Sequence, residues 1–458
     1  MTKTSLLRTV LFSTLSAALF PVAAQEHVHP PAHAVAPEHV HPPAHEATQD
    51  PHAMHGAAAG HAMPGGLHGD YPMSRDASGT SWQPDATPME GVHFSRGDWS
   101  GMLHGFVLAA SGDAEGPRGG RDSYVESMFM AMSQRPLAGG TFGVRAMASL
   151  DPWTLDKDGY GLLLQTGETA DGHEHLVDRQ HPHDALMELA ATWSRPLGAD
   201  DSVFVYAGLP GEPALGPPAF MHRFSGLDNP EAPLGHHWLD ATHITFGVVT
   251  AGWVHRDFKL EASAFNGREP DQHRKDIELR RLDSWSARAT WNPDAHWSLQ
   301  LSHGFLDSPE QLSPEVSVTR TTASAMHHRA LADGRVQWQS TLAWGRNRKD
   351  DAPASDAWLL ESALAWENGW TVFGRAERDD KDELFDHHDP LHGIPFTVSK
   401  LTLGAVHDFP RIGNGRLGVG AQASRHWLPA ALEPSYGGDP SSWLVFVRWK
   451  LSGTPMSH

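Results

Sequence analysis

From Trp99 onward, apolar and polar residues alternate with a period of two over most of the chain. In residues 285–291, one face carries only apolar side chains: Trp285, Ala287, Ala289 and Trp291. The other face carries polar ones: Ser286, Arg288 and Thr290. Residues 142–150 and 297–305 follow the same pattern, with His303 as an exception. Because successive side chains of a β-strand point to opposite faces, the pattern predicts strands with one apolar and one polar face.

The alternation and the turn signals between segments define sixteen candidate strands. Most have about the 9 to 11 residues that a tilted strand needs to cross a bilayer. They are residues 100–110, 123–134, 140–150, 185–195, 202–208, 242–251, 256–266, 283–292, 296–305, 318–329, 335–346, 356–366, 369–378, 396–408, 415–425 and 442–452. We therefore expect an all-β fold, a transmembrane antiparallel β-barrel of about sixteen strands within residues 96–453.

Short and long connections alternate between these strands. RPLAG, NPDA, ALADG and ENG are short turns, whereas two of the intervening connections reach about 30 residues. This asymmetry is typical of outer-membrane barrels, which have short periplasmic turns and longer extracellular loops. It predicts an even number of strands and places both termini on the periplasmic side.

The tryptophans are placed as a membrane barrel requires. Trp291 and Trp297 flank one short turn, and Trp366 and Trp370 flank another. Indole prefers the membrane interface because its ring is apolar and its N–H needs a hydrogen-bond partner. In the last strand, the residues expected to face lipid are Trp443, Val445, Val447, Trp449 and Leu451, with Leu444, Phe446, Arg448 and Lys450 facing the lumen.

Soluble antiparallel sandwiches also alternate, so they are the main alternative fold. Strand number, strand length, connection lengths and tryptophan positions together favour the membrane barrel. Helical membrane spans are excluded, because no run of 18 apolar residues follows residue 24. The chain has no cysteine, so disulfides cannot stabilise it outside the cytoplasm.

The N-terminal part has a different composition. Residues 1–24 combine Lys3 and Arg8 with an apolar stretch and a small-residue end, as in a secretory signal peptide. Residues 25–69 are rich in His, Pro and Ala, repeat EHVHPPAH at 26–33 and 38–45, and are expected to form a disordered arm in the periplasm. Residues 70–95 are a transition segment without an assigned role, and 454–458 form a C-terminal tail.

The arm carries many potential metal ligands. They are His27, His29, His33, His39, His41, His45, His52, His55, His61 and His68, with Met54 and Met63 among them and Met73 just beyond. Imidazole binds Cu(II), Zn(II) and Ni(II), and thioether suits Cu(I), so the mixture favours copper among divalent and other transition-metal ions without choosing one. The alternative is a soluble spacer that binds no metal.

Two further groups of residues carry potential ligands. Met128, Met130 and Met132 share one face of a predicted strand, as do Met102 and His104 of the strand before it, and Met147 lies on the polar face of the next. If these faces are luminal, they form a thioether and imidazole track for a soft cation. The simpler alternative, which the sequence favours, is methionines that contact lipid or fill space.

The long loops also contain clustered histidines and carboxylates. The first has HEH at 173–175 and DRQHPHD at 178–184, and the second has Met221, His222, His236, His237 and Asp240. Such clusters serve as metal or acid–base sites, although loop histidines more often make ordinary hydrogen bonds. No zinc-protease helix motif, nucleotide-binding loop or GxSxG elbow is present, so we expect no enzyme, and no catalytic residue is assigned.

The formal net charge of −20 makes nucleic acid an unsuitable partner. The expected partners are outer-membrane lipid, metal ions and periplasmic metal-handling proteins.

Three long stretches carry a resemblance. They are residues 159–189, which contain GYGLLLQTGETADG and DRQHPHD, residues 207–255, which contain GLPGEPALGPPAFMHRFSG, and residues 262–292. These stretches resemble a family of uncharacterised bacterial outer-membrane β-barrel proteins. The resemblance covers most of the chain from about residue 74 and implies the barrel, but no activity. The layout, with a His and Met-rich segment before a barrel, also resembles the copper resistance B outer-membrane proteins. That resemblance implies a role in copper or heavy-metal tolerance. The alternative function is a general porin with an incidental arm.

Overall fold

The computed structural model describes residues 65–350 and 352–453, which belong to one compact unit. The predicted signal peptide, the arm up to residue 64 and the tail at 454–458 lie outside these residues and stay predictions. The strands are β1 (Val92–Arg96), β2 (Trp99–Ala114), β3 (Gly120–Leu137), β4 (Gly140–Ala148), β5 (Tyr160–Thr169), β6 (His175–Gln180), β7 (Leu186–Pro196), β8 (Asp201–Gly208), β9 (Val248–His255), β10 (Phe258–Phe265), β11 (Ser284–Trp291), β12 (Trp297–Leu306), β13 (Val318–Leu331), β14 (Val336–Lys349), β15 (Ser355–Trp366), β16 (Trp370–Lys381), β17 (Phe396–Asp408), β18 (Gly415–Trp427) and β19 (Ser441–Leu451).

The helices are all short. They are η1 (Met73–Arg75), α2 (Asp151–Thr154), η2 (Phe220–His222), α3 (His236–Leu239), η3 (Ala241–His243), η4 (Ala430–Leu432) and α4 (Glu433–Tyr436). None of the helices in the described chain has the length and apolar character that crossing a membrane requires.

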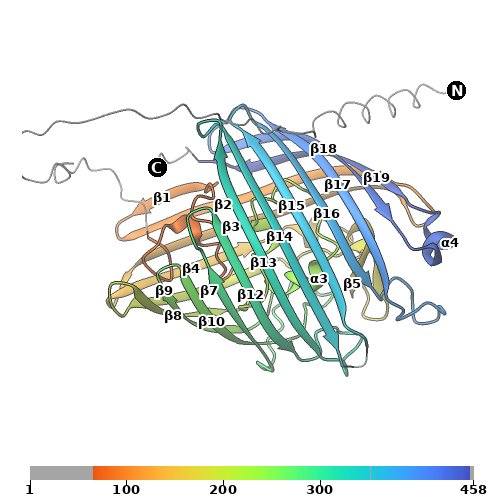
Figure 1. Ribbon diagram of the computed structural model, residues 1–458, viewed down its shortest axis with the longest axis horizontal. Coiled ribbons are helices and arrows are strands. Elements are labelled where there is room, and N and C mark those ends of the chain that lie inside the picture. The colour runs from red at the N-terminus through yellow and green to blue at the C-terminus, as the bar shows by residue number, and fades with distance from the viewer. Residues whose placement is uncertain (1–64, 351, 454–458) are drawn as a thin grey trace, which may run out of the picture. The chain divides into compact units, whose positions relative to one another are not determined.

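Sixteen strands form a closed antiparallel barrel (Figure 1). They follow one another from β2 to β4 and from β7 to β19, and the ring is closed where β19 pairs with β2. The short strand β1 pairs with β2 outside this ring, and β5 and β6 form a separate two-stranded sheet. Closure satisfies the amides of every barrel strand and leaves no open edge, as a membrane barrel requires. The predicted fold class is confirmed.

One predicted strand was misplaced. The alternation at 242–251 predicted a strand there, but the structure has η3 at Ala241–His243 and begins β9 at Val248. The apolar side chains of Ile244 and Phe246 are buried, yet they lie in a loop. Gly247, with φ of 106°, breaks the extended backbone before the barrel strand begins.

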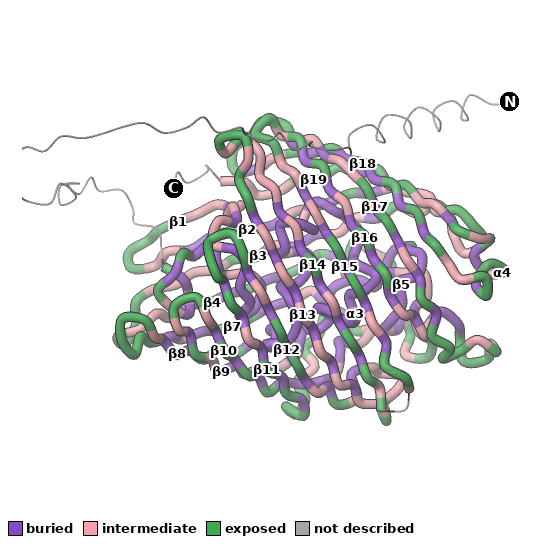
Figure 2. The backbone as a smooth tube through the Cα atoms, in the orientation of Figure 1, coloured by how far each residue is buried: buried purple, intermediate pink, exposed green. Residues whose placement is uncertain are grey.

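Buried and exposed residues alternate along the barrel strands (Figure 2). In β19 the exposed residues are Trp443, Val445, Val447 and Trp449, while Leu444, Phe446 and Arg448 are buried. The predicted orientation of this strand is thereby confirmed. Buried positions on other strands are often charged, including Lys259, Glu261, Arg288, Glu361, Arg375 and Lys400. The wall is therefore apolar outside and polar inside, which is the pattern of a membrane barrel.

Exposed tryptophans form two belts on the outer face. One lies near the short turns and comprises Trp253, Trp291, Trp297, Trp366, Trp370 and Trp449; the other, near the long connections, comprises Trp285, Trp358, Trp427 and Trp443. On single strands, members of the two belts are six to eight residues apart, or roughly 20–26 Å along the strand. With strand tilts of about 35–45°, this corresponds to a height of roughly 14–21 Å, slightly less than the apolar band of about 25 Å expected of such barrels.

Three chain segments, residues 65–91, 149–185 and 209–247, contribute buried residues that pack against the inner side of the wall, and we call these segments the plug. Segment 209–247 is almost entirely buried. Arg223 of this segment binds Glu361 of β15, and Glu231 binds Lys400 of β17 at 2.7 Å. In segment 65–91, Glu90 binds Lys450 of β19 at 2.9 Å. The polar interior surface of the wall is thus paired with the chain's own loops.

Candidate functional site in the barrel lumen

A cavity of about 90 Å³ between plug and wall is rich in methionine. Its lining includes six methionines and two histidines: Met73, Met89, Met102, Met130, Met132, Met221, His104 and His222. We call these eight residues the methionine pocket. They come from four segments of the chain: β2 and β3 supply the wall, and residues 65–91 and η2 supply the plug.

Strand register brings the wall residues of this pocket together. Met102 lies opposite Met132, and His104 lies opposite Met130, on the antiparallel pair β2–β3. Directly opposed residues of an antiparallel pair have Cβ atoms about 4.5–5.5 Å apart. Met147 of β4 pairs in turn with Met130. Met102, Met128, Met130 and Met147 are buried, so the expectation that these strand faces are luminal is confirmed and contact with lipid is wrong. The alternative that the methionines fill space stays a prediction.

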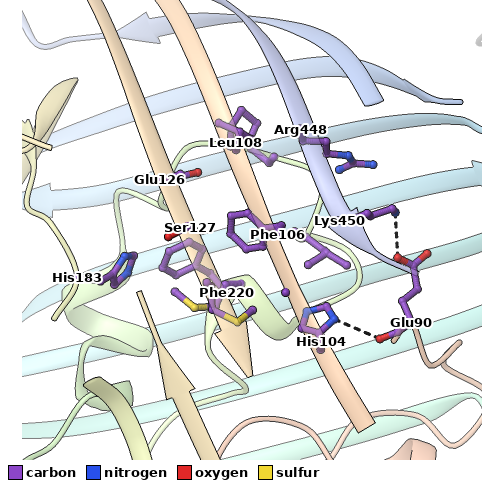
Figure 3. Close-up of a pocket in the computed structure, with 17 residues that line it drawn as sticks. Glu90, His104, Phe106, Leu108, Glu126, Ser127, His183, Phe220, Arg448 and Lys450 are labelled. Carbon is purple, nitrogen blue, oxygen red and sulfur yellow. Dashed lines mark hydrogen bonds and ion pairs between the residues drawn. The ribbon is translucent and has the colours of Figure 1, made fainter. Parts of the chain in front are cut away.

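A second cavity, of about 50 Å³, adjoins the methionine pocket (Figure 3). The two share Glu90, His104, Met221 and Leu227. Figure 3 shows His104 beside Glu90 on one side of this cavity and His183 on the other. The Glu90 carbonyl lies 3.2 Å from His104 Nδ1, and its carboxylate binds Lys450. The methionine pocket is therefore connected to the part of the plug that contains His183.

Thioether sulfur is uncharged and polarisable, and it selects soft ions such as Cu(I). His222 of η2 adds an imidazole whose Nε2 is buried without a hydrogen-bond partner. Burial, and then His104 beside it, lowers the pKa of His222 to about 3, so this imidazole is neutral and able to act as a ligand at ordinary pH. The ring centres of His104 and His222 are 6.3 Å apart.

Five histidines of the plug form a second group, the histidine cluster: His181, His183, His236, His237 and His243. The ring centres of His236 and His243 lie 5.1 Å apart, and those of His183 and His243 lie 5.7 Å apart. His181 is 6.2–6.5 Å from His183, His236 and His237. Phe220 packs edge-on against His236 and covers one side of the cluster.

Each imidazole of the cluster has an acidic or carbonyl partner. His183 Nδ1 lies 3.0 Å from Asp151, and His236 Nδ1 lies 2.7 Å from Asp240. The other three contacts are His243 Nδ1 to the Asp240 carbonyl at 2.9 Å, His181 Nε2 to Glu168 at 3.1 Å and His237 Nδ1 to Glu269 at 3.5 Å.

Burial sets the charge of these groups. It lowers the pKa of His181, His236 and His243 because an imidazolium ion would be poorly solvated there. Burial opposes ionisation of Asp240 as well, but Arg223 and His236 hold its pKa well below the ordinary value. His181, His236 and His243 are therefore neutral imidazoles, and Asp240 beside them is ionised.

The predicted ligands of the arm lie mostly outside the described residues: His27, His29, His33, His39, His41, His45, His52, His55, His61, Met54 and Met63. His68 is the exception. It is buried against Phe204, with ring centres 4.2 Å apart, and its carbonyl accepts a hydrogen bond from Ser202. The described chain is folded from Gly65, so His68 belongs to the plug and not to a free arm extending to residue 69. Apolar packing of its ring explains the difference.

The residues of the loop motifs lie at different places in the structure. His181 and His183 of DRQHPHD join His236, His237 and Asp240 in the cluster. Asp178 instead accepts a hydrogen bond from Tyr436, and Asp184 pairs with Arg274. His175 lies with Glu310 and Glu383, whose carboxylates Lys349 also contacts.

Sequence analysis missed His243, Asp151 and Met89. His243 lies within the misplaced strand, and Asp151 directly follows the predicted strand 140–150, outside the motifs singled out in the loop. The spacing of His236, Asp240 and His243 along the chain was the available signal, since one short helix followed by a turn brings them together.

No family model matches the chain, and no curated protein matches it. Solved structures of similar architecture include OprB of Pseudomonas putida (10% identity, 78% of this chain and 94% of that chain, TM-score 0.48). Another is OmpF of Salmonella typhi in complex with daunomycin (10% identity, 79% of this chain and 100% of that chain, TM-score 0.47). A third is an anion-selective porin from Comamonas acidovorans (11% identity, 77% of this chain and 100% of that chain, TM-score 0.43). These are likenesses of fold alone, and the closed ring of strands described above establishes the barrel independently.

Proposed function

We propose that this protein is an outer-membrane barrel that binds a soft transition-metal ion, copper in the first place, and passes it through the lumen. The observation that carries the proposal is the methionine pocket. Eight sulfur and imidazole side chains, drawn from wall and plug, line one cavity of about 90 Å³. Filling space would not require His104 and His222 among the methionines, nor a buried His222 Nε2 without a partner.

The position of the pocket suits transfer as well as binding. It adjoins the second cavity, and that cavity reaches the histidine cluster. An ion that leaves the methionines therefore meets imidazole next. Transfer between neighbouring weak sites lets an ion move without being trapped, which is how conduction pathways generally work.

The alternative, a general porin, is not favoured. A general porin has a water-filled lumen, whereas here the plug is tied to the wall by buried ion pairs. We propose that the arm lies in the periplasm and supplies or accepts the ion through its histidines and methionines. Periplasmic metal-handling proteins are proposed as its partners.

The test is Cu(I) binding by the full-length protein in detergent, measured by competition with a chromophoric Cu(I) chelator. We expect the variant M102L/M130L/M221L to lose one tight site that the wild type has. Methionine-to-leucine exchanges nearly conserve volume and usually cost less than about 1.5 kcal/mol, so the barrel should fold. The matched control is M187L/M326L, which replaces two buried methionines outside the pocket. Equal Cu(I) stoichiometry and affinity in all three proteins would refute the proposal.

A further inference from the structure

We propose that the histidine cluster is a separate binding site for one divalent transition-metal ion such as Zn(II), with His183, His236 and His243 as its ligands. The site uses none of the eight residues of the methionine pocket. It can therefore be present if the proposed function fails, and absent if that function holds.

The hydrogen bonds of the three imidazoles leave the same atom free. His183, His236 and His243 each have Nδ1 beside an oxygen, at 3.0, 2.7 and 2.9 Å. For His183 and His243, Nε2 is buried without any hydrogen-bond partner. Histidines that bind metal ions almost always have one ring nitrogen on the ion and the other on a carboxylate or carbonyl. Leaving such nitrogens buried and unpaired is otherwise costly.

Two of the three ring spacings are close to those expected around a shared ion. With a metal–nitrogen bond of about 2.0–2.1 Å and tetrahedral angles, two bound imidazoles have ring centres roughly 5 Å apart. The observed separations are 5.1 Å for His236–His243 and 5.7 Å for His183–His243. Their nitrogen atoms are more widely spread than the ligand atoms of His175, Glu310 and Glu383, which lie within 4.8 Å of one another. An ion would therefore draw the rings of the cluster inward.

The local charge calls for a cation. Asp151 is buried, and its ion-pair partner among the described residues is His183, with no lysine or arginine within 4.0 Å. A buried carboxylate without a cation is costly. A divalent ion on His183 would balance Asp151 through the imidazole. The carboxylates around His175 are different, because the Lys349 ammonium contacts both Glu310 and Glu383.

Acid–base catalysis is the competing use of a His–Asp pair. It would require a nucleophile or a substrate hydroxyl at the imidazole. Across residues 65–350 and 352–453, no serine, threonine or tyrosine hydroxyl is hydrogen-bonded to His183, His236 or His243. Three imidazoles converging beside two carboxylates are more than a catalytic pair needs and match the ligand number of a zinc site.

The experiment loads the full-length protein in detergent with Zn(II) and removes weakly held ions, including those on the arm, with a brief chelator wash. We expect about one retained equivalent in the wild type. H236Q and H243Q should each lose it, with at least a 100-fold weaker affinity. D151N should weaken binding by about 10- to 100-fold, because it removes the carboxylate that orients His183. The control is H255Q, since His255 has the same Nδ1–carboxylate distance, 3.0 Å to Asp201, but is exposed.

X-ray absorption of the zinc-loaded wild type provides a test that needs no variant. We expect three imidazole ligands and no sulfur. Retention of zinc by H236Q and H243Q would overturn the proposal, and so would the absence of chelator-resistant zinc from the wild type. Sulfur ligands in the absorption spectrum would also overturn it. The variant M102L/M130L/M221L should retain zinc fully, which separates this site from the methionine pocket.

Discussion

Arg223 links the plug to the barrel wall through two buried carboxylates. Its guanidinium Nη1 lies 2.7 Å from Asp240 within the plug. Its Nε and Nη2 lie 3.0 and 2.9 Å from the two carboxylate oxygens of Glu361 on β15. All three side chains are at most 1% exposed. The substitution R223M keeps much of the side-chain volume but removes the charge that two buried carboxylates share.

The expected cost follows from this burial. Removing one partner of a buried ion pair costs about 3–5 kcal/mol, because the remaining charge is left uncompensated. Arg375 still contacts Glu361, and His236 still contacts Asp240, so we expect the lower half of this range. At 1.4 kcal/mol per factor of ten, about 3–4 kcal/mol corresponds to a roughly 100- to 700-fold larger population of the released plug segment.

Hydrogen exchange measures this population directly. In R223M, protected amides of residues 209–247 should exchange about 100- to 700-fold faster, while the amides of the barrel strands should be unchanged. The control is R346M. Arg346 makes the same two-pronged contact with Asp356, at 2.8 and 2.7 Å, but it is 51% exposed. Exposed pairs contribute about 0–1 kcal/mol, so exchange in the plug should change less than about fivefold.

Exchange in residues 209–247 that is equally fast in R223M, R346M and the wild type would refute this account of the plug. Loss of the whole barrel in R223M, seen as loss of strand signal in circular dichroism, would refute it too. In that case the segment would be part of the folding core and not a separately attached plug.

Three other outcomes are expected. Burial raises the pKa of Glu212 to about 8. The wild type should therefore lose stability relative to E212Q as the pH rises from about 4.5 to 8, by about 5 kcal/mol at most. A difference in melting temperature between the two proteins that is the same at pH 4 and pH 8.5 would contradict this. Residues 210–246 can be replaced by a two-residue turn, because Gly208 pairs with Val248. This deletion should open the lumen and raise single-channel conductance in planar bilayers. Unchanged conductance would contradict a filled lumen. A peptide of residues 25–64 should bind Cu(II) at pH 7.5 and much more weakly at pH 5.5, because protons compete for its imidazoles; calorimetry showing no pH effect would contradict this.

The direction of the stability change at Glu212 follows from the protonation of its carboxyl group in the folded and unfolded states. Below about pH 4.5 the carboxyl group is protonated in both states, so it does not affect stability. Above that pH the unfolded chain releases the proton while the folded chain keeps it, so unfolding is favoured increasingly until about pH 8. Glutamine has nearly the same shape and no proton to release, so the effect should disappear in E212Q.

The barrel was predictable because membrane and lumen impose opposite polarity on neighbouring residues. Each strand then shows its orientation in its own sequence, as Trp443 and Leu444 do. Short turns and tryptophan positions indicated where the strands end. All sixteen predicted strands overlap a strand of the ring, and the one large displacement came from Ile244 and Phe246, whose alternation reflects burial in the plug.

The plug was not predictable from local sequence. The interior of the wall is charged, so a loop that packs against it is as polar as one that faces water. Arg223 and Glu231 look like ordinary surface residues until Glu361 and Lys400 are placed opposite them. The methionine pocket was predictable only in part, since alternation put Met102 and His104 on one face. Met89 and Met221 reach the same cavity through the plug.

The two ligand groups differ in chemistry along the lumen. The methionine pocket offers mostly thioether sulfur, and the histidine cluster offers imidazole with carboxylates behind it. The second cavity, with His104 on one side and His183 on the other, joins them. A soft ion would be held by the first group and a divalent borderline ion by the second.

The central claim is that the methionine pocket binds a soft metal ion. The most direct measurement is anomalous diffraction from crystals of the full-length protein soaked with Ag(I), which has the charge and ligand preference of Cu(I). A single strong peak among Met102, Met130 and Met221 is expected, and it should be absent from M102L/M130L/M221L crystals soaked in the same way. An empty pocket in the wild type, under conditions where silver occupies other sites, would contradict the claim.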